Sequence, residues 1–211
     1  PASINRLDVP IACAGLDEWF ATAGAERAAR AIRRGEACTV LVTADNDDSA
    51  YHRATALVAR AGSNPIGILL PASVERDLIK LIHVHLLARG AVPVLKPATD
   101  SAQAPRPQDL PAFDELSGPV VACSRTGVEG ARTRRPMIAV QVERLTPSAR
   151  RRMWSEAIPS LAPEAPFLAA RYPVEPAIAA AVAADLRMVA DLDGRLPAVG
   201  DVATIILVVE D

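Results

Sequence analysis

Aromatic residues are scarce in this sequence of 211 residues, at 3% of the chain. The core must therefore be built from alanine, valine, leucine and isoleucine, which favours layered α/β or helical packing over an aromatic-rich β-sandwich. Few aromatic side chains also leave little capacity for stacking on nucleic-acid bases. Because half of the residues are hydrophobic, the chain can bury one good core, or one core with a small added subdomain.

Cysteine, net charge and long apolar runs are limited as well. The three cysteines, Cys13, Cys38 and Cys123, are widely spaced beside apolar residues and indicate reduced thiols of a cytoplasmic protein. No apolar run has the length of a membrane span and no leader is recognisable, so we predict neither membrane insertion nor secretion. The net charge of −2 gives no overall attraction to nucleic acid or to an anionic membrane. Because the sequence begins with Pro1, we expect it to be part of a longer protein.

Apolar segments bracketed by polar or proline-containing ones alternate with segments of helical periodicity in the first two thirds of the chain. We predict strands at 39–43, 66–70, 91–95, 118–124 and 136–145, and helices at 16–34, 50–61 and 73–90. This alternation predicts a largely parallel sheet with helices on its faces.

The pattern changes to helices alone at Thr146. Thr146 is a good N-cap and Pro147 a good first helical residue, so a helix should begin there. Two further helices are predicted at 175–192 and 199–209. We therefore divide the chain into an α/β core, residues 1–145, and a helical lid, residues 146–211.

The polar loop after the first of these strands has the place of a phosphate-binding loop. Such a loop follows the pattern G-x-x-x-x-G-K-[ST], in which glycines let the backbone approach phosphate, the lysine neutralises it and the hydroxyl holds Mg²⁺. Counted from the end of the strand, the four defining positions fall on Ala44, Ser49, Ala50 and Tyr51. None of them matches the pattern.

Acidic residues in the same loop oppose phosphate binding further. Asp45, Asp47 and Asp48 would each repel a polyphosphate by about 1 kcal/mol per close pair in water, and by more where water is excluded. These three aspartates resemble part of an oxygen-ligand loop for a cation, but the turn glycine and the distal glutamate of an EF-hand are absent. We therefore expect a solvated acidic loop and no metal.

Histidines do not supply a metal site or a catalytic group in this sequence. His83 and His85 are two residues apart on a predicted helix, so they lie on different faces and are more consistent with structural residues. His52 lies beside the acidic loop, but no serine or cysteine nucleophile is marked out with it.

The order of elements resembles an AAA+ ATPase module over about residues 30–209. The most specific piece is "VQVERLTPSARRRMWSEAI", because in that family the last core strand leads into a lid whose first helix begins with a Thr/Ser-Pro cap. More narrowly, the chain is similar to the degenerate ATPase-like domain of large AAA family ATPases associated with contractile injection systems. The resemblance implies a P-loop NTPase-like, five-stranded sheet of order 5-1-4-3-2 with a helical lid.

The second motif of that family departs from its pattern too. The resemblance implies two acids at the end of the third strand, one for Mg²⁺ and one to polarise the attacking water, but Lys96 and Pro97 occupy these positions and Asp100 is too far along. Ser124, at the end of the fourth strand, is the candidate sensor of a γ-phosphate. No catalytic residue is assigned, and no cofactor is expected, with ATP and Mg²⁺ as the alternative.

Arginines are dense around the fifth strand and the start of the lid. Seven arginines of this region form two groups, before the fifth strand and at the start of the lid: Arg125, Arg132, Arg134, Arg135, Arg150, Arg151 and Arg152. Arg132, Arg134 and Arg135 lie where an arginine finger would be sought, although none can be assigned, and Arg187 is either a second sensor or a surface residue. Without an aromatic pattern beside them, these arginines predict a subunit or domain interface, or a solvated face, and no nucleic-acid partner.

Three functions follow from these observations. The first is a non-catalytic, pseudo-ATPase scaffold that docks other domains or subunits of a larger AAA+ ATPase, and it predicts no lysine within reach of residues 44–51. The second is a nucleotide-binding domain with unconventional residues, and it predicts an arginine folded back into that loop. The third is an unrelated doubly wound binding protein for a small molecule, in which residues 146–211 would add a layer to the sheet.

Overall fold

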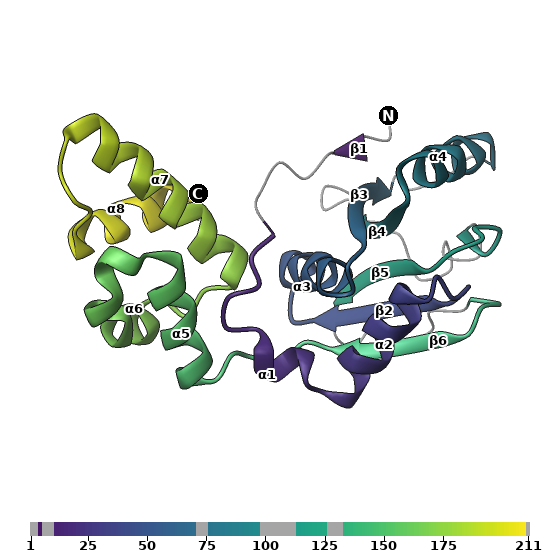
Figure 1. Cartoon of the computed structure of the whole chain (residues 1–211), viewed down its shortest axis with the longest axis horizontal. Helices are drawn as coiled ribbons and strands as arrows, with labels where there is room; N and C mark the ends of the chain where they lie inside the picture. The colour runs from purple at the N-terminus through teal and green to yellow at the C-terminus, as the bar shows by residue number, and fades with distance from the viewer. Residues whose placement is uncertain (1–3, 6–10, 71–75, 98–112, 126–132, 210–211) are drawn as a thin grey trace. The chain divides into compact units, whose positions relative to one another are not determined.

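The computed structural model describes residues 4–5, 11–70, 76–97, 113–125 and 133–209. The strands are β1 (Ile4–Asn5), β2 (Thr39–Ala44), β3 (Asn64–Leu70), β4 (Ala91–Pro97), β5 (Val120–Arg125) and β6 (Met137–Gln141). The helices are α1 (Asp17–Phe20), α2 (Ala23–Arg33), α3 (Asp47–Arg60), α4 (Arg76–Arg89), α5 (Pro147–Ala157), the 3₁₀ helix η2 (Pro159–Glu164), α6 (Ala165–Arg171), α7 (Pro176–Asp193) and α8 (Val199–Val209), as Figure 1 shows.

The strands form one sheet of order β1-β3-β4-β5-β2-β6. All neighbours from β3 to β6 run parallel, and their order confirms the predicted 5-1-4-3-2 arrangement. The two-residue β1 adds an antiparallel edge beside β3, which the sequence pattern did not predict. In the pairing of β2 with β5, Thr39 lies opposite Val120 and Ala44 opposite Arg125. The carboxyl ends of these two strands therefore meet at one edge of the sheet.

The chain divides into two compact units, which we call the α/β unit and the helical unit. The α/β unit contains β1 and the described residues between 19 and 143. In it, Ile79, Ile82 and Leu86 of α4 pack into a core that includes Ile66 and Leu95 of the sheet. Burial of such aliphatic side chains is the main force that holds a helix on a sheet.

The helical unit has a core of its own. Its described residues are 11–18 and 144–209, and Met153, Trp154, Leu168 and Leu186 are completely or almost completely buried in it. The predicted start of its first helix is confirmed: Thr146 is the N-cap of α5, its hydroxyl accepting a hydrogen bond from the Ala149 amide at 3.1 Å.

The short segment before α1 belongs to the helical unit, although it precedes the α/β unit in the chain. Gly15 has a φ angle of +73°, and a Cβ there would lie 2.6 Å from the carbonyl oxygen of Ala149. Only glycine fits such an approach. Asp17 pairs with Arg152 at 3.0 Å, and Glu18 accepts a hydrogen bond from Thr146 at 3.0 Å.

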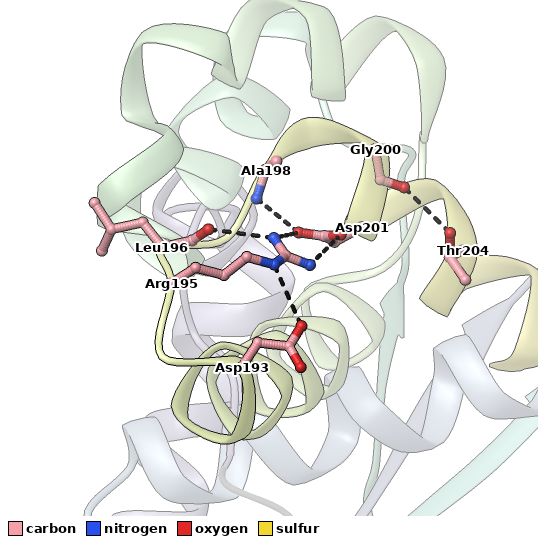
Figure 2. A network of polar contacts seen from close by, with 7 residues as sticks. All are labelled: Asp193, Arg195, Leu196, Ala198, Gly200, Asp201 and Thr204. Carbon is pink, nitrogen blue, oxygen red and sulfur yellow. Dashed lines mark hydrogen bonds and ion pairs between the residues drawn. The ribbon is translucent and has the colours of Figure 1, made fainter.

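Side chains also close the turn between α7 and α8, as Figure 2 shows. Arg195 donates two hydrogen bonds to the carboxylate of Asp201, at 2.7 and 2.9 Å, and a third to Asp193 at 3.2 Å. Asp201 also accepts a hydrogen bond from the Ala198 amide at 2.8 Å. These bonds to the charged form, the arginine's first, lower the pKa of Asp201 to about 2.

Three predicted elements differ clearly from the structure, and one of them, the helix after β2, is described with the candidate site below. The predicted helix 16–34 is two helices, because Thr22 interrupts it and caps α2, its hydroxyl accepting from the Ala25 amide at 3.4 Å. The predicted strand 136–145 is shorter, since β6 ends at Gln141. None of the helices formed by the described residues is long and apolar enough to span a bilayer.

Candidate functional site

The junction between β2 and α3 is the place where a phosphate-binding loop was sought. The strand ends at Ala44 and the helix begins at Asp47, so Asp45 and Asn46 alone connect them. The prediction that this helix begins near Ala50 is wrong. Asn46 is the N-cap, its side-chain oxygen accepting from the Ser49 amide at 2.7 Å, and acidic residues in a first helical turn are favourable to the helix dipole.

The backbone of this junction lacks the geometry of a phosphate cradle. A cradle of successive N–H groups needs residues that alternate between right- and left-handed conformations. Among the described residues, positive φ angles occur only at glycines, and none of these lies between Ala44 and Tyr51. The Ser49 amide is already bonded to Asn46. The start of α3 is therefore occupied by the chain's own side chain.

The motif positions face the interior of the α/β unit. Ala44, Ser49 and Tyr51 are buried, and Ala50, the expected lysine position, has an exposed fraction of 0%. A side chain at position 50 points into the core, where an ammonium group would lose its hydration. Replacing this residue alone cannot rebuild a phosphate-binding lysine.

Two cations from neighbouring strand ends pair with the acids of α3. Lys96, near the end of β4, contacts Asp48 with 2.5 Å between Nζ and Oδ1. Arg125, at the end of β5, contacts Asp47 with 3.0 Å between Nε and Oδ2. The expectation that no lysine reaches this loop is thus wrong, and the expectation of an arginine folded back into it is met.

Tyr51 and Lys96 also contact each other. The ammonium of Lys96 lies 5.4 Å from the centre of the Tyr51 ring, within the range of a cation–π contact. Tyr51 in turn approaches the backbone of β3, where an added Cβ at Gly67 would lie 2.0 Å from its hydroxyl oxygen. Gly67 therefore makes room for the ring on which Lys96 rests.

The environment fixes the charge states of these groups. A hydrogen bond from Lys96 holds the pKa of Asp48 below its ordinary value, so this carboxylate stays ionised near neutral pH. Burial raises the pKa of Tyr51 to about 12. Burial also raises the pKa of the Cys123 thiol, next to Ser124 on β5, far above neutrality. Neither Tyr51 nor Cys123 is poised to act as an anionic nucleophile.

The charge arrangement is the reverse of the one that binds and hydrolyses a nucleotide. A working site has a cation on the loop before the helix and acids at the end of a nearby strand, which is β4 in this sheet. Here the acids Asp47 and Asp48 are on the helix, while Lys96 and Arg125 are at strand ends. Among the described residues, the donors at this edge do not fit Mg²⁺-nucleotide, because β4 supplies no carboxylate and Asp48 already has a cationic partner.

The other predicted site residues have local partners or lie outside the described part. Ser124 donates to the carbonyl oxygen of Arg125 at 3.3 Å, and its sensor role stays a prediction. Pro97 is opposite Leu70 in the sheet. Asp100 and Arg132 lie outside the described residues.

Two of the arginines considered for nucleotide contacts, Arg135 and Arg187, have structural partners in the described part of the chain. The guanidinium of Arg135 is buried and donates to the carbonyl oxygens of Phe113, at 3.4 Å, and of Gly118. These two hydrogen bonds connect Arg135 to both ends of residues 113–118, the segment before β5. Arg187 donates to the carbonyl of Ala183 at 3.1 Å within its own helix.

Histidine, cysteine and acidic residues do not gather into a metal centre in the part of the chain that the structure describes. His83 contacts the hydroxyl of Ser117 at 3.1 Å, which is a structural contact of α4. The residues that sequence reasoning missed are the partners: it named Lys96 only as a departure from a motif, and Arg125 only as one of seven arginines. The sequence did contain a signal for these pairs: acids are present in the loop where the first motif carries a lysine, and a lysine is present where the second motif carries acids.

No protein-family model matches the sequence, and no curated protein sequence is significantly similar to it. Among solved structures, the RuvB Holliday junction branch migration motor of Thermotoga maritima superposes with a TM-score of 0.58 at 17% identity, covering 94% of this chain and 72% of that one. A variant of the same motor gives a TM-score of 0.56 at 16% identity, with coverages of 97% and 70%. The chain has an AAA+-like fold. At this level of identity, the likeness establishes the P-loop NTPase-like architecture and carries no activity.

Proposed function

We infer that this chain is a non-catalytic AAA+-like domain, a pseudo-ATPase that serves as a scaffold or interaction module. The scaffold function did not predict Lys96 and Arg125 at this loop, but the observation that carries this inference is that Asp48 and Asp47 already pair with these two cations. These pairs link α3 to the ends of β4 and β5. In an active enzyme, bound nucleotide and Mg²⁺ would occupy the corresponding space.

Electrostatics support the loss of nucleotide affinity. A polyphosphate at the start of α3 would have to compete for Lys96 and Arg125, and would leave Asp47 and Asp48 near its own negative charge. Each such like-charge contact costs about 1 kcal/mol in water and more at a site from which water is excluded. Phosphoryl transfer depends almost entirely on positioning and electrostatic stabilisation, so hydrolysis is expected to be negligible.

The partners that fit this function are other domains or subunits of a larger AAA family ATPase. The AAA+-like fold supports this general type of partner. The narrower relation to ATPases of contractile injection systems is part of the same proposal, and it rests on the resemblance to a degenerate domain in which the element order is retained and both nucleotide motifs are lost. A cytoplasmic location agrees with Cys13, Cys38 and Cys123, which form no disulfide.

A second candidate function is nucleotide binding without hydrolysis. It is favoured by one observation, the presence of Lys96 and Arg125 beside the start of α3. In that case the two cations would exchange their carboxylate partners for phosphate oxygens. ATP with Mg²⁺ would then be the ligand.

A titration with a fluorescent ATP analogue and Mg²⁺ separates the two functions. The wild-type chain would be compared with Lys96→Met and with the matched control Lys80→Met, which removes an exposed lysine that pairs with Asp77 at 3.1 Å. A scaffold predicts no saturable binding by any of the three, and no phosphate release. An active AAA+ ATPase in the same assay shows that binding is detectable.

Micromolar binding by the wild type and the Lys80→Met control, with loss in Lys96→Met, would replace the scaffold by the second candidate. Equal binding by all three proteins would contradict both proposed functions, because the scaffold binds no nucleotide and the second candidate needs Lys96 to bind it. Binding with measurable phosphate release would contradict the non-catalytic assignment itself.

A further inference from the structure

Four charged side chains at the start of α3 form a cluster within the α/β unit. Asp47 and Asp48 are neighbours in the first turn of the helix, whereas Lys96 and Arg125 lie near the ends of β4 and β5, two strands that pair directly. Lys96 Nζ contacts Asp48 Oδ1 at 2.5 Å, and Arg125 Nε contacts Asp47 Oδ2 at 3.0 Å. Two cations from the sheet thus face two anions from the helix.

The two pairs also act on each other. The hydrogen bond from Lys96 is the main cause of the lowered pKa of Asp48, and the positive charges of His52 and Arg125 lower it further. Arg125 therefore stabilises both carboxylates, although its direct contact is with Asp47. The four side chains behave as one electrostatic cluster.

Each pair joins one shielded group to one exposed group. The side chain of Asp47 is 12% exposed and that of Lys96 is 24% exposed, whereas their partners Arg125 and Asp48 are 61 and 64% exposed. A shielded charge is costly unless an opposite charge compensates it. Lys96 therefore requires an anion beside it, and Asp48 supplies that anion.

Lys96 is positioned by more than its carboxylate partner. Its ammonium lies 5.4 Å from the centre of the Tyr51 ring, and that ring is buried against the backbone of β3 at Gly67. The cation–π contact remains when the carboxylate is removed. Little further ordering of Lys96 is then needed for another anion to bind.

We propose that Lys96 and Arg125 form an oxyanion site for phosphate groups, and that Asp47 and Asp48 are its built-in occupants, which keep it closed. The carboxylates bring the negative charge that a phosphate would otherwise bring, so the site is inhibited by its own helix. Two cations on paired strands suit pyrophosphate or a phosphate ester, whose oxygens accept several charge-assisted hydrogen bonds. This site rests on the proposed function, in which the wild-type chain holds no nucleotide, and names the group that the acids exclude.

Removal of the acids is therefore expected to create binding. The cluster has no net charge as it stands, one positive charge in Asp48→Asn and two in Asp47→Asn/Asp48→Asn. Asparagine has nearly the shape of aspartate, so the substitutions change charge with little change in packing. Pyrophosphate is expected to bind the double variant with a dissociation constant on the order of a millimolar, at least tenfold tighter than it binds the wild type.

Calorimetric titration with pyrophosphate, without Mg²⁺ and at constant ionic strength, tests this site. The chains to compare are the wild type, Asp48→Asn, the double variant, and the double variant with Lys96→Met. Asp77→Asn is the matched control, because it frees the exposed Lys80 from a pair of 3.1 Å elsewhere in the α/β unit. We expect saturable binding by Asp48→Asn and by the double variant, and none by the other three chains.

Three results would overturn the proposed site. The first is that neither Asp48→Asn nor the double variant binds, and the second is that the wild type binds as tightly as they do. The third is binding that persists after Lys96→Met or that appears in Asp77→Asn, since other cations would then hold the anion. Circular dichroism checks that Asp48→Asn is folded, which the exposure of this carboxylate predicts.

The titration of the wild type with the ATP analogue and Mg²⁺ is a separate measurement, so the two failures are distinguishable. A wild type that binds neither pyrophosphate nor ATP, together with variants that gain nothing, would overturn the oxyanion site and leave the scaffold function intact. A wild type that binds ATP would contradict the scaffold function itself.

Discussion

Two clusters of paired charges, one in each unit of the molecule, differ in the distance along the sequence between their partners. In the α/β unit, the pairs at the start of α3 join residues that are 48 and 78 positions apart in the sequence. In the helical unit, Arg195 binds acids that are 2 and 6 positions away. The local pairs complete a turn as soon as it forms. The distant pairs exist only when β4, β5 and α3 have all reached their places in the sheet.

Each unit also contains one of the two tryptophans, so the stability of each is measurable separately. Trp19 is buried in the α/β unit and donates to the Gln141 carbonyl at 2.9 Å. Trp154 is buried in the helical unit and donates to the Tyr172 carbonyl at 3.2 Å. Trp154→Phe leaves a fluorescence signal from the first unit, and Trp19→Phe leaves one from the second. The following predictions use these two backgrounds.

The largest effect is expected from Ala50→Lys, the substitution that a sequence motif would suggest for restoring phosphate binding. Position 50 is completely buried, and an unpaired ammonium in a core costs several kcal/mol. Urea unfolding followed through Trp19 should show a severe loss of stability, without gain of ATP binding. The control Ala59→Lys, at the half-exposed end of α3, should be close to wild type. A stable Ala50→Lys variant that binds ATP would show that α3 begins elsewhere.

A smaller loss is expected from Gly67→Ala. The added Cβ would lie 2.0 Å from the Tyr51 hydroxyl oxygen and 3.1 Å from the ring carbon that bears it, so side chains must shift at a cost of about 1–3 kcal/mol. Tyr51→Phe in the same protein removes the closest atom and should recover part of the loss. Gly118→Ala, where nothing lies within 4 Å of an added Cβ, is the control. Additive effects of the two substitutions would contradict this contact.

Acid titration tests the pair of Asp48 and Lys96, which are distant in the sequence. The folded-state pKa of Asp48 is lowered by Lys96, so its contribution is present above the unfolded carboxyl pKa of about 4 and is lost as the pH falls through the lower folded-state value. In Asp48→Asn, the free energy of unfolding followed through Trp19 should therefore fall less between about pH 4 and lower pH than it does in the wild type. Because the carboxylate is largely exposed, the contribution is expected to be about 0.2–1 kcal/mol. His52 and Arg125 also act on this carboxylate, and their charges persist in the variant.

The smallest effect is expected for the local pair. The pKa of Asp201 is about 2 in the folded chain, so the stabilisation from Arg195 is complete above about pH 4 and disappears as the pH falls toward 2. Asp201→Asn should change the signal of Trp154 in that window and leave Trp19 unaffected. High salt should weaken the same contribution, since the pair is exposed. A change in the Trp19 signal would mean that the two units unfold as one.

Local signals in the sequence predicted much of the fold. Apolar runs bracketed by glycine and proline gave the strands, and Thr146 with Pro147 gave the start of α5, because caps and fixed φ angles act over a few residues. Residues 159–171 were left without a prediction, since Pro159, Pro163 and Pro166 obscure the helical pattern there. The start of α3 was placed too late because its first turn is acidic and was interpreted as loop.

The candidate site was less accessible to sequence reasoning. The loss of both nucleotide motifs was apparent from Ala50 and Lys96, because a motif is recognised only from which residue occupies each of its positions. The pairing of Lys96 with Asp48 depends on strand order and register across the sheet, and neither is encoded locally.

The position of Gly15 against α5 has a consequence for synthesis on the ribosome. The segment that begins the helical unit emerges before residues 19–143, and the helices on which it packs emerge only after them. At about 5–20 residues per second, that delay is on the order of ten seconds. During this interval the α/β unit can complete its sheet, whereas residues 11–18 wait for their partner. Folding of the helical unit is thereby tied to the synthesis of residues 144–209, and a nascent chain without them would have the α/β unit but only residues 11–18 of the helical unit.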